Sequence, residues 1–327
     1  MKILVLFTGG TIGSTVSGGY ISTDCKKSYK LLEMYKAISN KDIDFEQAEP
    51  YTLLSENLTG ETIFTLGKAL KDNINKGYDG IIITHGTDTI QYSAAALSYF
   101  LPDLSIPVLL VSSNYVLDDK KNNGIANFSA SVDFIETLAG KGIFVPYQNS
   151  DGITYIHKGT RLLPHLPYSD NLYSIDNQYY AIASENKIEI NKKYVSSKEN
   201  HDIKFALPQS WNSDILRIYP YPGMQYPDLS SKPKAILIDS YHSGTICSLT
   251  PGIEEFFTKA SSMNIPIFLA GAKDGPAYDS VKLWEKYHIN TLPAASPIAM
   301  YIKLWMAIDS DNLKDIMKTS VCDDILE

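Results

Sequence analysis

The segment 80–89 constrains the fold of this chain more than any other stretch. Isoleucine occupies positions 81–83, and such a β-branched apolar run is typical of a strand buried on both faces of a parallel sheet. The run ends in Thr-His-Gly-Thr-Asp-Thr at 84–89, and Ala and Leu then recur at helical spacing over 90–100. A strand that passes through a polar loop into a helix predicts an open α/β sheet with this loop at its carboxyl edge, where such folds bind ligands.

The polar residues of this loop serve either helix capping or chemistry. Thr and Asp are preferred N-cap residues, so capping alone explains one of them. Five of the six positions in 84–89 carry a hydroxyl, an imidazole or a carboxylate, which is more than one cap requires. We therefore favour a functional loop, because binding and catalytic residues gather on polar loops that a rigid scaffold positions.

A second junction of this kind lies near the start of the chain. Positions 3–7 form an apolar run, and Thr-Gly-Gly-Thr-Ile follows at 8–12. Glycine lets backbone N–H groups approach a ligand closely, and such groups can stabilise a developing oxyanion. The pair lacks the spacing of a dinucleotide-binding loop and the Gly-Lys of a phosphate-binding loop. The turn-rich segment 14–23, with glycine at 18 and 19, predicts a hairpin or a lid.

Composition narrows the class of protein. Of 327 residues, 29 are Lys or Arg and 37 are Asp or Glu, and the net charge of −8 disfavours nucleic acid as a principal partner. Cys25, Cys247 and Cys322 are too few and too scattered for a disulfide framework, and neither they nor the histidines show metal-ligand spacing. No apolar run reaches membrane-spanning length. We therefore expect a cytoplasmic protein that uses no membrane, metal or cofactor.

Length and strand pattern predict two parallel-sheet domains of the α/β class. Residues 1–191 carry both junctions and are expected to form the larger, flavodoxin-like domain. The polar, turn-rich stretch 192–212 is the predicted linker. Within 213–327, short apolar runs alternate with helical stretches such as 251–262, which predicts a smaller C-terminal α/β domain.

The two junctions, 8–12 and 84–89, together resemble the two signatures of the bacterial asparaginase/glutaminase family, and the likeness extends over most of the chain. It is closest to the cytoplasmic type I L-asparaginases. The resemblance implies an amidohydrolase that converts asparagine, or glutamine, to the free acid and ammonia through a threonine nucleophile. It also implies a homodimer or homotetramer, because the loop 240–245 matches one that completes a neighbouring subunit's active site in tetrameric members.

The family's catalytic roles carry over to particular residues. Thr11 matches the nucleophile, and Tyr20 matches the tyrosine that activates it. Thr87 matches the second catalytic threonine, and Asp88 matches the neighbouring acid that binds the substrate's amine. The substrate-binding residues that the resemblance implies, besides Thr87 and Asp88, are Gly10, Ser55, Glu56 and Gly86.

These residue types suit amide chemistry without the resemblance. A threonine hydroxyl needs a neighbouring base before it attacks an amide carbon. Two carboxylates, here Glu56 and Asp88, suit the ammonium group of an amino acid. Taken alone, Ser55 is better explained as the N-cap of a helix predicted over 56–72, and Tyr20 is equally consistent with an exposed loop aromatic.

The segment 155–164 departs from the family pattern. Members carry Gly-x-Arg-x-x-Lys, and this lysine is their proposed proton acceptor; Gly159 and Arg161 match, but Pro164 occupies the lysine position. Proline carries no ionisable group, so Lys158 becomes the candidate substitute base. The substitution predicts slow hydrolysis of free asparagine with aspartate binding preserved. It leaves two alternatives open, a weakened homologue that senses amino acids and an amidohydrolase for a modified or peptide-borne amide.

Overall fold

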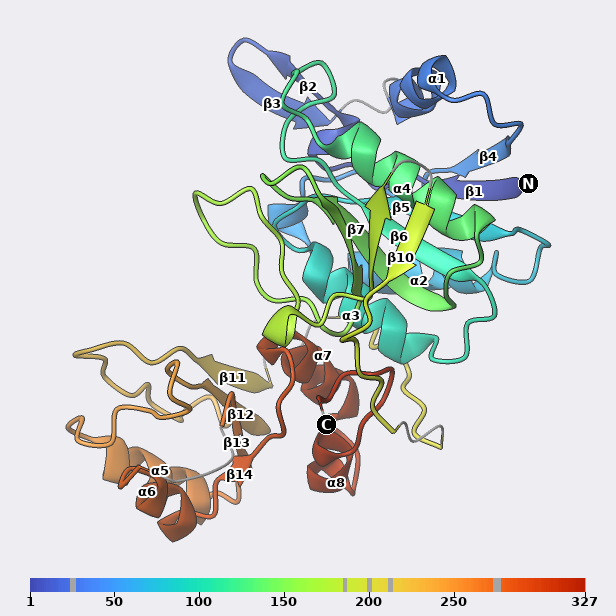
Figure 1. The fold of residues 1–327 in the computed structure, drawn as a ribbon. Coiled ribbons are helices and arrows are strands. Elements are labelled where there is room, and N and C mark those ends of the chain that lie inside the picture. The colour runs from blue at the N-terminus through green and yellow to red at the C-terminus, as the bar shows by residue number, and fades with distance from the viewer. Residues whose placement is uncertain (24–27, 185–186, 199–201, 211–213, 273–277, 327) are drawn as a thin grey trace. The chain divides into compact units, whose positions relative to one another are not determined.

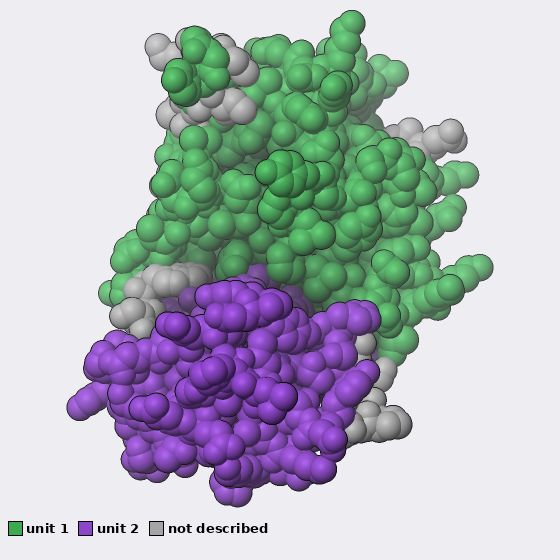
Figure 2. Space-filling model, turned by 90° about the vertical axis from the view of Figure 1, so that its left-hand side faces the viewer, with its two compact units in different colours: residues 1–195, 204–210 green, residues 196–203, 211–327 purple. Residues whose placement is uncertain are grey.

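The computed structural model describes residues 1–23, 28–184, 187–198, 202–210, 214–272 and 278–326. Figure 1 shows the elements in chain order, and Figure 2 colours the two compact units that they form. Unit 1 contains Met1–Val195 and Lys204–Ser210, and unit 2 contains Ser196–Ile203 and Trp211–Glu327.

The predicted linker, 192–212, is built into the two units. In unit 1 the rings of Phe205 and Tyr99 pack with their centres 5.4 Å apart. In unit 2 the backbone N–H of Ser197 donates a hydrogen bond of 2.6 Å to Asp323. Polar composition predicted a linker, but Ser197, Phe205 and Leu207 of this segment are buried.

Unit 1 is organised around a mixed sheet. In chain order its strands are β1 (Lys2–Leu6), β4 (Asp44–Ala48), β5 (Gly80–Thr84), β6 (Pro107–Val111), β7 (Gly142–Gln148), β8 (Thr154–Lys158), β9 (Ala181–Ser184) and β10 (Lys187–Ile190). They lie in the order β10-β9-β8-β7-β6-β5-β1-β4, parallel from β7 to β4 and antiparallel from β7 to β10. Every residue of β5 and β6 is buried, as expected for central parallel strands.

Helices cover both faces of this sheet (Figure 1). They are α1 (Ser28–Ile38), α2 (Gly60–Lys71), α3 (Ile90–Phe100) and α4 (Gly124–Glu136). Residues of α1 and α4 pack in one apolar cluster, which contains Ile82 of β5. Residues of α2 and α3 pack in the other, which contains Ile81 and Ile83. The alternation of side chains along β5 therefore supplies both layers of the core.

A short hairpin follows β1. Its strands are β2 (Ser14–Ser17) and β3 (Tyr20–Thr23), which pair antiparallel. Gly18 and Gly19 form the turn with φ angles of 59° and 84°. Two consecutive left-handed residues are the requirement of the hairpin turn whose twist matches its strands, so the glycine pair explains the hairpin and confirms this prediction.

Unit 2 is built on a parallel sheet, as predicted. Its strands are β11 (Ile215–Ile218), β12 (Ala235–Asp239), β13 (Ile267–Ala270) and β14 (Asn290–Thr291), in that order. Its helices are α5 (Ile253–Ser262), α6 (Val281–Lys286), α7 (Pro297–Ala307) and α8 (Leu313–Lys318). Helices α5 and α6 pack on one face, and α7 and α8 on the other. Among the described residues, no helix is both long and apolar enough to cross a membrane.

Candidate active site

The segments that follow β1, β4 and β5 are joined at the carboxyl edge of the large sheet. The N–H of Thr8 donates to the hydroxyl of Thr84 at 3.1 Å, and the hydroxyl of Thr8 donates to the carbonyl of Thr84. The N–H of Leu53 donates to the carbonyl of Thr8 at 3.2 Å. These hydrogen bonds, two of them through threonine hydroxyls, bring the two sequence signatures together with the segment that contains Ser55, although the three segments are far apart in the chain.

Glycine makes this close approach possible at two positions. A Cβ atom on Gly10 would lie 2.5 Å from the backbone nitrogen of Gly86, and one on Gly86 would lie 2.3 Å from Oγ of Ser55. Gly10 also has a φ of 75°, in the region that side chains rarely adopt. Position 10 therefore requires glycine for the packing of backbone on backbone, and position 86 requires it for the close approach of the Ser55 side chain.

Gly10 differs in one respect from its expected role. Its N–H donates to the carbonyl of Leu53 at 3.0 Å, so it is not directed at a substrate as an oxyanion donor. The spacing of the signature does not reveal this bond, because Leu53 lies in a different segment. Gly10 instead fixes the turn that carries Thr11.

Thr11 begins the short helix η1 (Thr11–Gly13) directly after Gly10 and is partly exposed. The hydroxyl of Ser14 donates to the carbonyl of Gly10 at 2.7 Å and stabilises the turn between these two residues. Tyr20, at the start of β3, is 80 % exposed. The structure thus fixes the backbone at Thr11 and leaves the phenol of Tyr20 facing solvent.

Ser55 is directed at the second signature. It begins the short helix η3 (Ser55–Asn57), is 4 % exposed, and its hydroxyl lies 3.4 Å from Oδ2 of Asp88. The hydroxyl of Thr89 donates to the carbonyl of Ser55 at 2.9 Å. The interpretation of Ser55 as a helix cap is wrong, because α2 begins later and is capped by Thr59.

The two predicted carboxylates are open to a ligand. Glu56 and Asp88 are both exposed, and Thr87 beside Asp88 is partly exposed. His85, in the same loop, is 2 % exposed; its Nδ1 lies 2.9 Å from the carbonyl of Gly86, and its Nε2 lies 2.8 Å from the hydroxyl of Ser93. Burial lowers the pKa of His85, which favours a neutral ring that supports the loop.

Lys158 does not reach this edge. It is the last residue of β8, which runs antiparallel to β7, so it pairs with Phe144 towards the amino end of β7. Its ammonium lies 5.0 Å from the centre of the Phe144 ring, a cation–π contact. The prediction that Lys158 replaces the family lysine is therefore wrong, because the strand directs it to the opposite end of the sheet.

The remaining matches on this segment are structural. Arg161 is fully buried, donates to the carbonyl of Val195 at 2.8 Å, and stacks 4.5 Å from the centre of the Tyr194 ring.

Pro164 is exposed. The next residue, His165, is partly buried, and its Nε2 lies 3.3 Å from the hydroxyl of Tyr147 in β7. No sequence pattern marks His165, since it stands one position beyond the lysine site.

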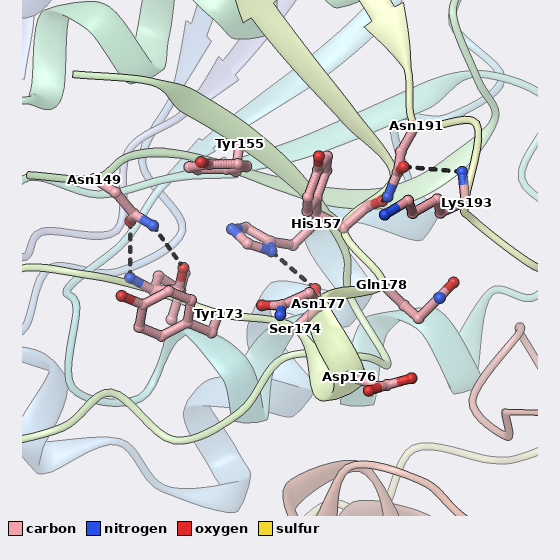
Figure 3. A pocket seen from close by; sticks show the side chains of 12 residues that line it. Asn149, Tyr155, His157, Tyr173, Ser174, Asp176, Asn177, Gln178, Asn191 and Lys193 are labelled. Atoms are coloured by element: carbon pink, nitrogen blue, oxygen red, sulfur yellow. Dashed lines mark hydrogen bonds between the residues drawn. The ribbon is translucent and has the colours of Figure 1, made fainter. Parts of the chain in front are cut away.

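A cavity of about 470 Å³ lies over β8 (Figure 3). His157 lines it and is 2 % exposed; its Nδ1 lies 2.8 Å from the hydroxyl of Ser174. Burial lowers the pKa of His157 to about 3, so its ring is neutral. The other lining residues include Asn149, Tyr155, Tyr173, Asn177, Gln178 and Tyr179. None of the lining residues belongs to the loops after β1, β4 or β5, so this cavity is separate from the edge of the sheet where those loops meet.

Two further sequence expectations concern metals and the loop 240–245. Among the residues that the structure describes, no three of His, Cys, Asp and Glu gather as a metal-ion site. The loop 240–245 follows β12 and is closed by a hydrogen bond of 2.7 Å from the N–H of Tyr241 to the carbonyl of Thr245.

The chain matches known proteins over most of its length. It is 27% identical to a glutamyl-tRNA(Gln) amidotransferase subunit from Methanosphaera stadtmanae, over 98% of this chain and 76% of that protein. The corresponding protein from Sulfolobus acidocaldarius is 26% identical over 99% and 75%.

Solved structures share the fold. The thermostable L-asparaginase of Thermococcus kodakarensis superposes with a TM-score of 0.81 at 22% identity, covering all of both chains. L-asparaginase I of Vibrio cholerae has a TM-score of 0.75 at 19% identity, covering 100% of this chain and 99% of that one. Residues 2–196 match the family described as "Asparaginase, N-terminal". The chain therefore belongs to the asparaginase family, as its two signatures indicated.

Proposed function

We propose that this chain is an amidohydrolase that cleaves the side-chain amide of asparagine or glutamine with Thr11 as the nucleophile. The observation that supports it best is the joining at one edge of the three segments that carry Thr11, Ser55 and Asp88. An open carboxyl edge of an α/β sheet is the place where such folds bind small ligands.

The proposed reaction has two steps. The Thr11 oxygen attacks the amide carbon, and ammonia leaves with the proton that the hydroxyl gave up; water then cleaves the resulting ester to the acid. Tyr20 is assigned the role of activating Thr11 from the family resemblance. Because its phenol is 80 % exposed, this role requires the hairpin β2–β3 to close over the substrate.

In the proposal, the site selects its ligand through the ligand's charged α-amino and α-carboxylate groups. In the proposal, Glu56 and Asp88 bind the α-ammonium by charge-assisted hydrogen bonds, and Ser55 helps to bind the α-carboxylate. The bond between Ser55 and Asp88 holds these two groups in register before a ligand arrives. This arrangement favours a free amino acid over an amide without a charged amine.

An ammonia-release assay with asparagine and with glutamine tests the proposal, with hydroxylamine added to trap an acyl-enzyme as the hydroxamate. We expect release and trapping by the natural chain, and neither by Thr11→Val. Hydrolysis of free asparagine is expected to be slower than in family members that keep the lysine. Equal release by the natural chain and Thr11→Val would reject the nucleophile.

A second candidate function is favoured by the relatives' identity. Both are described as one subunit of an amidotransferase, so the same amide cleavage in this chain would serve an acceptor within a larger assembly. Preference for glutamine over asparagine, with slow release until a partner is added, would favour this candidate. Aspartate binding without any ammonia release would favour an amino-acid sensor, and release only from a modified or peptide-borne amide would favour the remaining alternative.

The proposal includes a homodimer or homotetramer. Its basis is the likeness of the loop 240–245 to one that completes a neighbour's site in tetrameric family members. Sedimentation at micromolar concentration is expected to show a species larger than one chain of 36.3 kDa. A fully active species of that mass would contradict it.

A further inference from the structure

The cavity over β8 belongs entirely to unit 1, because its lining residues all lie within 149–193. Tyr155 and His157 stand two positions apart on β8, so both point to the same face of the sheet. They pair with Tyr147 and Val145 of β7, which belong to the apolar cluster of α2 and α3, and the cavity lies on that face. Its volume of about 470 Å³ is within the range of small-molecule pockets, about 300–1,000 Å³.

One ring nitrogen of His157 requires a partner that the protein does not supply. His157 is 2 % exposed, and its Nδ1 lies 2.8 Å from the Ser174 hydroxyl. Its Nε2 is buried and has no hydrogen-bond partner among the described residues. Figure 3 shows the bond to Ser174 from one ring nitrogen and the other nitrogen directed away from it. Because a buried polar atom without a partner costs free energy, Nε2 indicates where a polar ligand atom belongs.

Two carboxamides of the lining already bind the backbone with both their nitrogen and their oxygen. Asn149 donates to the carbonyl of Leu172 at 3.1 Å and accepts from the N–H of Leu172 at 2.9 Å. Asn191 donates to the carbonyl of Tyr179 at 2.9 Å and accepts from the N–H of Lys193 at 3.0 Å. These amides shape the wall, so a ligand with hydroxyls on every side, such as a sugar, would lose water without gaining enough partners.

Three tyrosines, Tyr155, Tyr173 and Tyr179, give the cavity aromatic surface. The rings of Tyr155 and Tyr179 pack edge to face with their centres 4.9 Å apart. The hydroxyl of Tyr155 donates to Asp151 at 2.9 Å, and that of Tyr173 accepts from Asn171 at 3.0 Å. Both of these partners lie outside the lining, so the rings rather than the hydroxyls are left for a ligand. Aromatic ring surfaces favour a flat ligand that stacks on them.

We propose that the cavity over β8 binds a neutral heteroaromatic ring of the nucleobase type, with the polar edge of the ring at Nε2 of His157 and its face against the tyrosines. A base edge carries N–H donors beside N or O acceptors, so it can pair with Nε2 in either tautomer of the imidazole. The charged lining residues, Asp176 and Lys193, are exposed and of opposite sign, so the lining carries no net charge. The uncharged nucleoside therefore fits better than its phosphate. This inference is independent of the amidohydrolase function.

Calorimetric titration of the full chain with adenosine, guanosine, cytidine and uridine tests the proposal, with glucose and inositol as ligands that lack a flat ring. We expect at least one nucleoside to bind with a dissociation constant of about 1 mM or below, and neither control to bind. Saturating aspartate is expected not to displace the nucleoside, because the residues proposed to bind aspartate do not line the cavity. Failure of all four nucleosides to bind, equal binding of glucose or inositol, or displacement by aspartate overturns the proposal.

Two variants locate the bound ring. Tyr173→Ala is expected to lower nucleoside affinity by about fivefold to a hundredfold, the usual loss when a base no longer stacks on an aromatic ring. The matched control is Tyr168→Ala, because Tyr168 is an exposed tyrosine of unit 1 outside the lining, and its affinity should be unchanged. His157→Phe keeps a ring but removes the hydrogen bond at Nε2, so affinity should fall by about twofold to tenfold. Unchanged affinity in both Tyr173→Ala and His157→Phe overturns the site.

A spectroscopic measurement on the natural chain covers the case in which His157→Phe does not fold. Burial lowers the pKa of His157 to about 3, so its ring stays neutral at pH 7 and its nitrogen resonances report hydrogen bonding rather than protonation. In the chain labelled at histidine nitrogen, a bound nucleoside is expected to move the Nε2 resonance of His157. The resonances of His288, an exposed histidine of unit 2, should stay in place. A nucleoside that binds without moving the His157 resonance overturns the role of Nε2.

Discussion

Two regions at the carboxyl edge of the large sheet are built differently. Around Thr11 and Asp88, the segments after β1, β4 and β5 are joined by hydrogen bonds that each involve a backbone group and by glycines that have no room for a side chain. In the turn after β8 that carries Pro164, the His165 ring contacts the Tyr147 side chain. Packing that involves the backbone allows few substitutions, whereas a side-chain contact can be replaced by another of different chemistry.

The largest effect is expected at the nucleophile on the backbone-built side. Thr11→Val removes the hydroxyl at nearly constant size, so kcat should fall at least about 10³-fold while the fold is kept. Ammonia release and thermal unfolding measured on the same preparation check this. Most of the activity surviving with an unchanged melting temperature would mean that Thr11 is not the nucleophile.

A smaller loss of activity is expected when the close approach of Gly10 to the Gly86 backbone is disturbed. In Gly10→Ala the new Cβ would meet the Gly86 backbone, so the turn that carries Thr11 must move. This displacement should lower kcat by about 10²-fold. The matched control is Gly77→Ala, because Gly77 has a φ of 78° beside the 75° of Gly10 but no neighbour within 4 Å. The control should cost only the local strain, about 1–2 kcal/mol of stability. Equal activity in the two variants would show that the close approach is not needed.

Binding of the substrate's charged amino group should respond less strongly to substitution. Asp88→Asn keeps the size of the side chain but removes the charge, so aspartate affinity should fall by about tenfold to a hundredfold, the value of a hydrogen bond to a charged group. Because Asp88 is exposed, the melting temperature should hardly change. Calorimetric titration with aspartate measures the effect. Turnover of N-acetyl-asparagine as fast as asparagine would contradict a site for the free amine.

The smallest effect is expected in the turn after β8, when the family's lysine is restored by Pro164→Lys alone. Because a lysine at this position must work without the fixed φ of proline, Pro164→Lys should raise kcat by less than about tenfold, below the usual contribution of a general base. A rise of hundredfold or more would show instead that this chain lacks a working acceptor. Comparison of kcat at pH 7.5 in both proteins decides between these cases.

Sequence reasoning succeeded where the fold depends on local patterns. The isoleucines at 81–83 predicted a central strand, and the turn glycines at 18 and 19 predicted the hairpin. It failed where contacts are distant in the chain. The bond between Gly10 and Leu53 and the direction of Lys158 both depend on which strands become neighbours. His165 carried no motif at all, because its place follows from a contact with β7.

Pro164 has a consequence for conformational entropy. A lysine side chain has about 2 kcal/mol of rotamer entropy to lose when it is fixed in a site. An imidazole has two torsions, and here the preceding proline also fixes its own φ, which removes freedom from the unfolded chain. A turn that has Pro-His in place of a long flexible ammonium therefore begins closer to its folded geometry, and the contact with Tyr147 needs to immobilise less.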